Sequence, residues 1–415
     1  MNTIDYAGIR GFNHEPDMGE GYSHEQTLRE MGYAKRLNFN SCRLFLGGLR
    51  GWRRDPKGFI ANLIDFMDVA WEHGISTTPI LMYPYQADPH KWPSRDDKDE
   101  FGFPVLPDGY QPQNWHIGED YARAVVTALM GHPGLLFWDI MNEPSYGTYL
   151  FTKMSREVED KRAEPVWAFV RHFCDFVHSL DTIHPLGIGH TLIEDTERSE
   201  TGDIVDIIIF HDYSDTRAKI DAVCREALRL SKKYGKPVLN NETGCLCRAN
   251  PYDAALEACQ KYHIGWYMFK LMIETTGGVD WSKVHGICYP DGTIRDPSIV
   301  AALFGFFRNR NDTTIYPDVN REGCAERALY AAKAALDSRA GVADMLEAAE
   351  LTANLLEAGE LVPMAMPPTA RIERYRRETN PNYQEVRAFL YDLSMTLQKT
   401  CEMLPGDRIN SMHRV

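Results

Sequence analysis

Short apolar segments alternate with longer amphipathic segments up to about residue 307, and this alternation restricts the folds open to the chain. The short segments have the length and composition of buried strands, and the long ones have the apolar spacing of helices. Strands that alternate with helices form βαβ units and a parallel sheet. The expected strands are Gly8–Phe12, Ser41–Leu46, Ser76–Met82, Leu135–Met141, Leu186–Thr191, Val205–Phe210, Val238–Asn241 and Gly265–Leu271.

The segments between these strands are expected to be helices, with Pro165 suited to the first turn of one of them. Between the fifth and sixth strands, Ile193–Ser199 predicts at most a short helix. Eight parallel strands with helices between them predict an α/β fold, a (β/α)8 TIM barrel whose functional residues lie where strands end and loops begin. The alternative is a doubly wound open sheet, but no glycine-rich phosphate loop follows the first strand. The expected helices are Glu25–Leu37, Phe59–His73, Gly118–Met130, Pro165–Leu180, Arg217–Tyr234 and Tyr252–Tyr262.

The character of the chain changes from Cys324 onward. Three Ala- and Leu-rich segments have helical periodicity and no strand pattern, and the Pro-rich stretch Leu361–Thr369 separates the second from the third. We therefore expect a barrel domain over residues 1–310 and a helical C-terminal extension over residues 311–415. The extension has no candidate catalytic residue and could pair subunits into a homo-oligomer. The three segments are Glu326–Ser338, Gly341–Leu355 and Tyr383–Met403.

Charge and composition argue against several classes of partner. The formal net charge of −14 and the pI of about 5.5 argue against nucleic acid. The first residues lack the basic and apolar regions of a signal peptide, and no apolar run approaches a membrane span. We expect a cytoplasmic protein without a membrane partner, whose nine cysteines are reduced thiols. Cys245 and Cys247 form a C-x-C pair without a second Cys/His pair nearby, so neither a metal nor another cofactor is expected.

Glu143 and Glu242 each follow an apolar strand in a matching context. Glu143 lies in the run FWDIMNEP from residue 137, and Glu242 lies in the run PVLNNETG from residue 237. Pro144 cannot donate a strand hydrogen bond and disfavours helical geometry at Glu143, so the strand should end there. Two carboxylates at strand ends are what retaining glycoside hydrolysis requires, because one protonates the leaving oxygen and the other attacks the anomeric carbon. The alternative is that each is an ordinary polar loop residue.

Other strand ends supply polar residues that such a reaction needs. Arg43 is a charged residue within an apolar strand, and Glu242 is its natural partner, although a different structural ion pair is the alternative. Asn142 can donate from its amide to a sugar 2-hydroxyl. His211 and Tyr213 leave the sixth strand two residues apart, so both should face the same side. Tyr213 would bind the nucleophile, and His211 would bind substrate or tune the acid.

Further candidates come from the first and eighth strands. Asn13, His14 and Glu15 follow the first strand, and Glu15 is a third carboxylate that competes with the two glutamates for their roles. Trp266 in the eighth strand could form the floor under a bound sugar, as could Phe269, although core packing explains both nearly as well.

The segment from Tyr83 to Ile117 is too long for a plain connection between a strand and a helix. Its aromatic residues include Tyr83, Tyr85 and Trp115, among several prolines. Loops of this length in compact domains are usually lids or binding walls. Aromatic faces stack on sugar rings, so some of these side chains are expected to bind substrate. The others would pack the loop onto the barrel.

Taken together, these residues resemble glycoside hydrolase clan A, and most closely the cellulase family 5. The resemblance covers about residues 7–307 and rests on Asn142-Glu143-Pro144, Glu242, Arg43 and His211-x-Tyr213. It implies that Glu143 is the acid/base and Glu242 the nucleophile, with the other motif residues in the active site. The chain has Tyr83-Pro84-Tyr85 where that family usually has a His-Asn after the third strand, and the helical tail lies outside the family pattern.

The prediction is a retaining β-glycosidase that acts by exo-cleavage on short β-linked oligosaccharides or small β-glycosides. A transglycosylase on the same barrel is one alternative. A non-catalytic carbohydrate-binding or scaffold barrel is another, although a binding site has no need for two converging acids. A metal-dependent hydrolase is disfavoured because no His-x-His follows the first strand.

Overall fold

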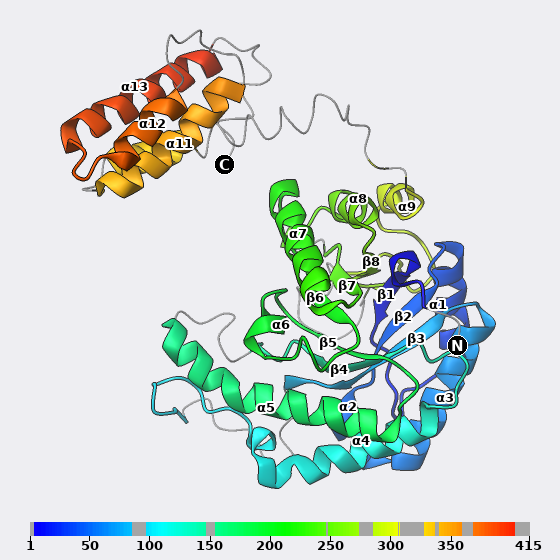
Figure 1. The fold of residues 1–415 in the computed structure, drawn as a ribbon. Helices are drawn as coiled ribbons and strands as arrows, with labels where there is room; N and C mark the ends of the chain where they lie inside the picture. Colours follow the sequence, from blue (N-terminus) through cyan, green and yellow to red (C-terminus); the bar gives the residue numbers. More distant parts are fainter. Residues whose placement is uncertain are drawn as a thin grey trace. The chain divides into compact units, whose positions relative to one another are not determined.

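The structure is a computed structural model that describes residues 4–84, 97–146, 154–245, 248–273, 285–305, 307, 328–336, 340–358 and 368–402. Contacts between Cα atoms divide the chain into two compact units, Met1–Arg308 and Asn309–Val415. The barrel lies in the first unit and a helical bundle in the second (Figure 1). Among the described residues, no helix combines the length and the apolar character needed to cross a membrane.

Eight parallel strands form the sheet of the first unit. They follow one another in the order β5-β4-β3-β2-β1-β8-β7-β6, and parallel bridges from Gly187 to Ile207 and from His190 to Phe210 join the two end strands. The sheet is therefore a barrel, as the alternation of segments predicted. The strands are β1 (Arg10–His14), β2 (Ser41–Phe45), β3 (Ser76–Met82), β4 (Trp138–Asn142), β5 (Leu186–Gly189), β6 (Ile208–His211), β7 (Val238–Thr243) and β8 (Gly265–Met268).

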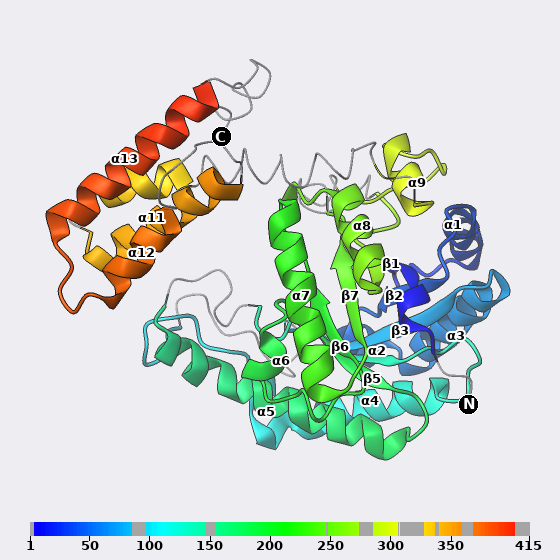
Figure 2. The ribbon, with the colours of Figure 1, turned by 45° about the horizontal axis from the view of Figure 1, so that its top comes forward.

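Helices surround the strands, as Figures 1 and 2 show from two directions. Their start signals are local: Ser23, Asp55, Ser155 and Thr216 each accept a hydrogen bond from a first-turn N–H. The described helices of this unit are α1 (His24–Arg36), α2 (Gly48–Arg54), α3 (Pro56–Glu72), α4 (Trp115–Leu129), α5 (Arg156–Leu180), α6 (Asp195–Arg198), α7 (Arg217–Tyr234), α8 (Tyr252–Tyr262) and α9 (Pro297–Leu303), with 3-10 turns η1 (Tyr6–Gly8), η3 (Asp108–Tyr110) and η4 (Pro112–Asn114).

The α5 helix differs from its prediction at its start. It begins at Arg156, and Pro165 lies inside it rather than in its first turn. The added turns carry charges spaced four residues apart, with Arg156 Nε 3.2 Å from an Asp160 oxygen and Lys161 Nζ 2.7 Å from a Glu157 oxygen. Such pairs stabilise an exposed helix, so this polar segment is helical without an apolar face. The sequence also did not predict α2 or α9.

The barrel interior has an apolar layer toward the amino-terminal ends of the strands. This layer contains Tyr267, whose hydroxyl lies 2.7 Å from Ser41 Oγ and 3.3 Å from Thr78 Oγ1. Gly11 leaves the space for that ring, because a Cβ at Gly11 would lie 2.1 Å from it. Polar side chains lie above this layer, toward the carboxyl ends of the strands. The apolar residues of the layer are Ile9, Phe137, Ile207, Ile209, Leu239 and Tyr267.

The second unit is a small helical bundle with its own core. Its described helices are residues 328–336, α11 (Val342–Ala358), α12 (Pro368–Arg377) and α13 (Tyr383–Glu402). The α12 helix begins within the Pro-rich stretch that was expected only to separate two helices. Core side chains from all four segments, among them Ala332, Met345, Tyr375 and Leu390, are buried together.

Candidate active site

Glu143 and Glu242 lie at the carboxyl ends of β4 and β7, close to each other inside the barrel mouth. One carboxylate oxygen from each, together with a ring nitrogen of His211, forms a group in which all three atoms lie within 4.8 Å of one another. Glu143 has a φ of +45°, which is uncommon for a residue other than glycine. Its N–H donates to Gly189 O at 2.8 Å, and this bond fixes the turn that aims the side chain inward.

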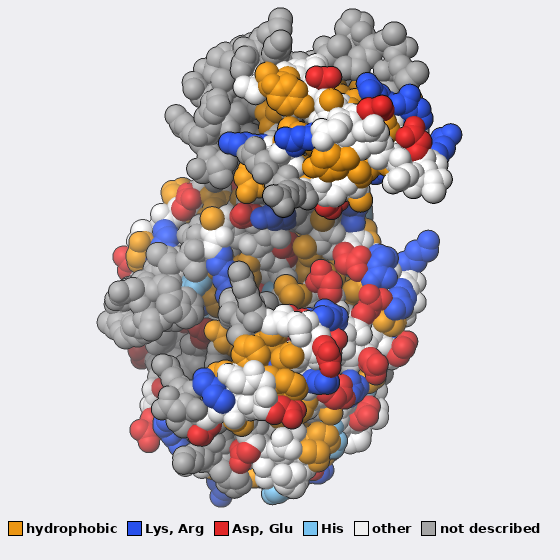
Figure 3. Space-filling view, turned by 90° about the vertical axis from the view of Figure 1, so that its left-hand side faces the viewer, with side chains coloured by type: hydrophobic (Ala, Val, Ile, Leu, Met, Phe, Trp, Pro, Cys, Tyr) orange, Lys and Arg blue, Asp and Glu red, His pale blue; other side chains and the backbone are white. Residues whose placement is uncertain are grey.

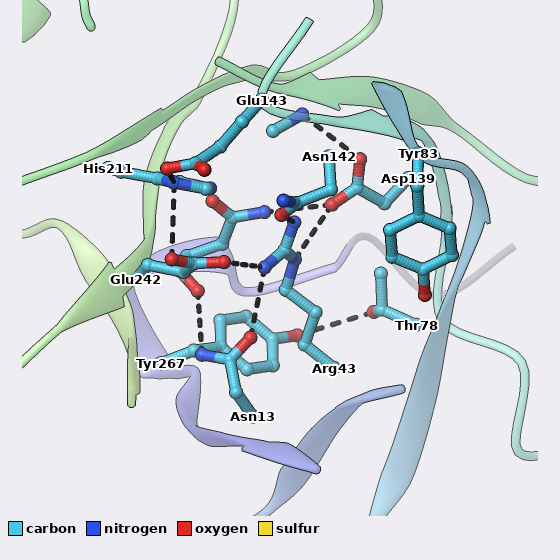
Figure 4. A network of polar contacts seen from close by, with 12 residues as sticks. Asn13, Arg43, Thr78, Tyr83, Asp139, Asn142, Glu143, His211, Glu242 and Tyr267 are labelled. Carbon is cyan, nitrogen blue, oxygen red and sulfur yellow. Dashed lines mark hydrogen bonds and ion pairs between the residues drawn. The ribbon is translucent and has the colours of Figure 1, made fainter. Parts of the chain in front are cut away.

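Arg43 binds both β4 and β7 from the centre of the barrel (Figure 4). Its Nη1 donates to Glu242 Oε1 at 2.5 Å, and its Nε donates to Asp139 Oδ2 at 2.8 Å. The remaining donors reach Asn13 Oδ1 at 3.0 Å and Asn142 Oδ1 at 2.7 Å. The expected pair between Arg43 and Glu242 is therefore present, and Asp139 is a second ionic partner.

Asp139 and Asn241 were not predicted as site residues, although Asp139 orients Arg43 and Asn241 donates to Asp139. Asp139 is fully buried and accepts from Arg43, from Gly189 N at 3.0 Å and from Asn241 Nδ2 at 2.9 Å. The signal that singled out Arg43, a charge inside an apolar strand, applies equally to Asp139. Asn13 is fixed by the backbone of β7 and β8, because its amide nitrogen donates to Asn241 O at 3.0 Å and to Met268 O at 3.2 Å.

His211 and Tyr213 both contact Glu242 and so face the same side, which is what their spacing of two residues predicted. Tyr213 Oη donates to Glu242 Oε2 at 2.6 Å. His211 Nδ1 lies 2.9 Å from Glu143 Oε1 and 3.3 Å from Glu242 Oε2, so the imidazole bridges the two glutamates. Figure 4 shows this bridge on the side of the site away from Tyr83.

The two glutamates occupy different electrostatic environments. Burial raises the pKa of the Glu143 carboxyl above its ordinary value, and the charges of Arg248 and Arg43 only partly oppose this rise. Glu242 instead accepts hydrogen bonds on both oxygens, from Arg43 and Tyr213. Burial lowers the pKa of His211 to about 4, so the imidazole is neutral near pH 7. Burial, followed by the Glu242 charge, raises the pKa of Tyr213 well above its ordinary value, which keeps its hydroxyl a donor.

Aromatic rings surround this polar group. The Phe269 ring lies 6.3 Å from the Tyr213 ring and 6.4 Å from the Phe45 ring, both edge-on. Phe45 stacks on Tyr83 at 5.6 Å. The Tyr83 hydroxyl accepts from Leu46 N at 2.9 Å, so its polar end is engaged by the protein while its ring adjoins the site.

Several predicted site residues lie elsewhere. His14 faces outward, with Nε2 3.0 Å from Glu30 on α1, because it directly follows the inward-facing Asn13. Trp266 also faces outward and packs edge-on to Phe39; the next residue, Tyr267, is the one inside the barrel. The structure does not bring either side chain to the glutamates.

Trp115 is also separate from the glutamate pair, Glu15 is paired with a lysine, and Tyr85 lies outside the described residues. Trp115 begins α4 and stacks on His172 of α5 with ring centroids 4.4 Å apart, so it packs the outer helical layer. Glu15 forms an ion pair with Lys270 at 2.5 Å. This pair accounts for the third carboxylate that sequence alone could not assign.

Glu143, His211 and Glu242 have the composition of a metal site, but their partners favour a different use. Arg43 Nη1 already supplies a positive charge to Glu242 Oε1, and Tyr213 donates to Oε2. A cation bound there would displace or oppose the guanidinium. The arrangement instead suits proton transfer by Glu143 beside a carboxylate held by neighbouring donors.

Comparisons with known proteins identify the fold. No protein-family model and no curated protein sequence matches the chain. Among solved structures, the β-galactosidase from the psychrophilic Marinomonas ef1 superposes with a TM-score of 0.54 at 12% identity, over 71% of this chain and 58% of that one. The barrel has the fold of clan A glycoside hydrolases.

Two further structures agree. An exo-β-1,4-mannosidase from Opitutaceae bacterium strain TAV5 has a TM-score of 0.53 and 16% identity, over 73% of this chain and 61% of that one. An endo-β-1,4-mannanase from Thermotoga petrophila has a TM-score of 0.51 and 15% identity, over 75% and 79%. The resemblance to clan A is thus confirmed at the level of the fold, and the roles of individual residues rest on the geometry of this site.

Proposed function

We propose that the chain is a retaining β-glycosidase in which Glu143 is the general acid/base and Glu242 is the nucleophile. The observation that carries this proposal is the closeness of the two glutamates, because one carboxylate oxygen of Glu143 lies within 4.8 Å of one carboxylate oxygen of Glu242. Retaining enzymes hold their carboxyl groups about 5–5.5 Å apart, whereas inverting enzymes leave about 6.5–9.5 Å for a water.

The different surroundings of the two carboxyl groups assign the roles. Glu143 is the one whose pKa burial raises, as an acid that must hold a proton near neutral pH requires. Glu242 is fixed by Arg43 and Tyr213 with its oxygens beside Glu143. In the first step Glu242 attacks the anomeric carbon while Glu143 protonates the departing oxygen. In the second step Glu143 removes a proton from water, which displaces Glu242.

Asn142 is suited to bind the sugar 2-hydroxyl. Its amide oxygen accepts from Arg43 Nη2 at 2.7 Å, which leaves its NH2 group to donate. That NH2 group has no hydrogen-bond partner within the described part of the chain. Neutral His211 positions the Glu143 carboxyl through its Nδ1 contact at 2.9 Å. Phe269, Phe45 and Tyr83 supply the aromatic wall.

We further propose exo-action on short β-linked substrates. The solved neighbours named for mannosidase, mannanase and galactosidase activity support a β-linked substrate as a class, and a panel of nitrophenyl β-glycosides would identify the sugar. Added acceptor sugars in the same assay would reveal transglycosylation as new glycosidic products.

Azide separates the two glutamates experimentally. Glu242→Ala should lose nearly all turnover, and azide should restore part of it by attacking from the vacated side to give an α-glycosyl azide. Glu143→Ala should lose about 10²- to 10⁴-fold on substrates with poor leaving groups, and azide should then yield a β-glycosyl azide. Turnover at the wild-type level in Glu242→Ala would exclude the assignment.

A further inference from the structure

Arg248 is a second cation at the site that the proposed mechanism does not use. It follows β7 in the loop before α8, and its guanidinium carbon lies 4.2 Å from the centroid of the Tyr213 ring. Tyr213 in turn binds Glu242. The flat face of the guanidinium is therefore covered by Tyr213, while the side chain as a whole is exposed. Stacking of this kind holds an arginine in place and leaves its N–H edge available to donate.

Arg248 differs from the other cations near the glutamates in having no acceptor among the residues that the structure describes. The Arg43 guanidinium contacts four side chains, and Lys270 is paired with Glu15. Over the residues that the structure describes, the Arg248 guanidinium has neither a hydrogen-bond acceptor nor an ion-pair partner. Its N–H donors are thus open to a ligand in the space that Arg248 lines beside His211 and Tyr213.

That space is a pocket of about 510 Å³. His211, Tyr213 and Arg248 form its wall on the side of the glutamates. The segment after β5, including Leu192 and Glu194, also lines the pocket. The pocket is large enough for one sugar unit or a group of similar size, and it shares two residues with the glutamate site.

The position of Arg248 relative to Glu143 indicates which part of a substrate this pocket would hold. The charge of Arg248 lowers the pKa of Glu143 more than the charge of Arg43 does, against the larger effect of burial. Arg248 lines the same pocket as His211, whose Nδ1 lies 2.9 Å from Glu143 Oε1, so this pocket adjoins the proposed acid, which itself protonates the leaving oxygen. A free cation favours loss of the proton from such an acid, and this effect would vanish once an anion neutralised the cation.

We propose that Arg248 binds an anionic group on the leaving-group portion of the substrate, so that the preferred substrate is a β-glycoside with an acidic aglycone. This inference rests on the proposed glycosidase function and adds the substrate class. The planar guanidinium fork binds either a carboxylate or a phosphate through paired hydrogen bonds, so a uronic acid and a phosphorylated sugar are the two sources of this chemistry. In either case the bound anion would also help Glu143 to retain its proton.

The test compares umbelliferyl and 3-carboxyumbelliferyl β-glycosides of the sugar that the enzyme accepts. The ratio of their kcat/KM values is measured for the wild type, Arg248→Gln and Arg248→Lys, so that the difference between the two leaving groups cancels. Arg248→Gln should lower the ratio by about 10- to 100-fold, mostly through KM of the carboxylated substrate. Arg248→Lys should keep part of the preference, because it keeps the charge without the fork.

A second readout is the pH profile on the neutral substrate. Removing the Arg248 charge should move the alkaline limb of kcat/KM to higher pH, because Glu143 then holds its proton more tightly. Lys233→Gln is the matched control, since Lys233 also stacks on a tyrosine, Tyr234, at 4.8 Å, but pairs with Glu197 on the outside of the barrel. It should change neither the ratio nor the profile.

The outcomes separate the two proposals. Glucuronate and glucose 6-phosphate are then compared as inhibitors of the neutral substrate, and the one whose inhibition is lost in Arg248→Gln identifies the source. An unchanged ratio in Arg248→Gln, or equal losses on both substrates, would overturn the role of Arg248 while leaving the glycosidase intact. A wild-type enzyme that hydrolyses no β-glycoside would overturn both.

Discussion

At the scale of single residues, the site depends on charged side chains buried inside the barrel. They lie directly above the apolar layer at the amino-terminal ends of the strands. Arg43 and Asp139 are both fully buried, and each would be costly alone. They are tolerated because Arg43 contacts two carboxylates and two amides, while Asp139 also accepts from Gly189 N and Asn241. The pair holds Glu242 and Asn142 from behind, so the residues that would touch substrate are positioned by residues that would not.

The ionised form of Glu143 destabilises the folded protein, and the proposed role of Glu143 as an acid explains why this cost is retained. Burial raises its pKa above the ordinary value, so the folded-state pKa lies above the unfolded value. The stability that this group contributes is present below the unfolded pKa and is lost as pH rises through the folded pKa. Glu143→Gln removes the titration, and we expect it to raise the Tm at pH 8 by about 2–4 °C with little change at pH 4.

Thermal unfolding of the wild type and Glu143→Gln across pH 4–8 measures this difference. Asp215→Asn is a suitable control, because Asp215 is exposed and its pKa is lowered, first by a hydrogen bond from Lys219. Its Tm difference should not increase toward alkaline pH. A Glu143→Gln variant that is less stable than the wild type at pH 8 would contradict the interpretation of Glu143 as a strained acid.

At the scale of elements, the order of strands and helices was predictable, but the facing of individual side chains was only partly so. Strand ends correctly located Asn13, Arg43, Glu143, His211 and Glu242 around one mouth. The sequence could not show that Tyr267 rather than Trp266 faces inward, because a shift of one residue exchanges the two faces of a strand. Irregular register between β6 and β7, where His211 pairs with Glu242, cannot be read from periodicity.

Loop aromatics and polar helix starts were the other source of error. Trp115 is an aromatic residue in a long loop segment, as sugar-binding residues often are. It instead packs against Phe169 and His172 of α5, because α4 begins at Trp115 and this helix packs on α5. The start of α5 was misplaced because salt bridges rather than an apolar stripe stabilise its first turns. In both cases tertiary contacts and surface charge, which have no periodic signature, decided the local structure.

The β5 strand makes a prediction at this scale, because its backbone approaches Arg43 closely. A Cβ at Gly189 would lie 2.6 Å from Arg43 Nη2 and 3.0 Å from Asp139 Oδ2. Gly189→Ala should therefore displace the guanidinium and, with it, Glu242. We expect kcat/KM to fall by about 100-fold, since small misplacements of catalytic groups cost this much, together with a lower Tm.

Gly131→Ala is the control for this substitution, because nothing lies within 4 Å of a Cβ built there. It should leave activity and Tm close to those of the wild type. If Gly189→Ala retained wild-type kcat/KM, Arg43 would not need its observed position for activity, and the proposed way in which Glu242 is oriented would be wrong.

At the scale of the whole molecule, the two units are built as separate cores. The apolar clusters of the barrel lie within residues 1–308, whereas the helical unit buries its own set in α11, α12, α13 and residues 328–336. Side chains of both charge signs are interspersed over the face that Figure 3 shows. The predicted pairing of subunits through the helical unit stays a prediction.

Because the two cores are separate, a chain of residues 1–308 should fold by itself. Its kcat/KM should lie within about twofold of that of the full chain, since every residue placed at the site lies in the barrel. Calorimetry of the full chain should show two transitions. Leu390→Asp should lower only one of them, since Leu390 is buried in the helical core, and should leave activity intact. A truncated barrel that remains folded by circular dichroism but loses activity would show that the helical unit contributes to the site. Light scattering on both chains would then decide whether it does so by pairing subunits.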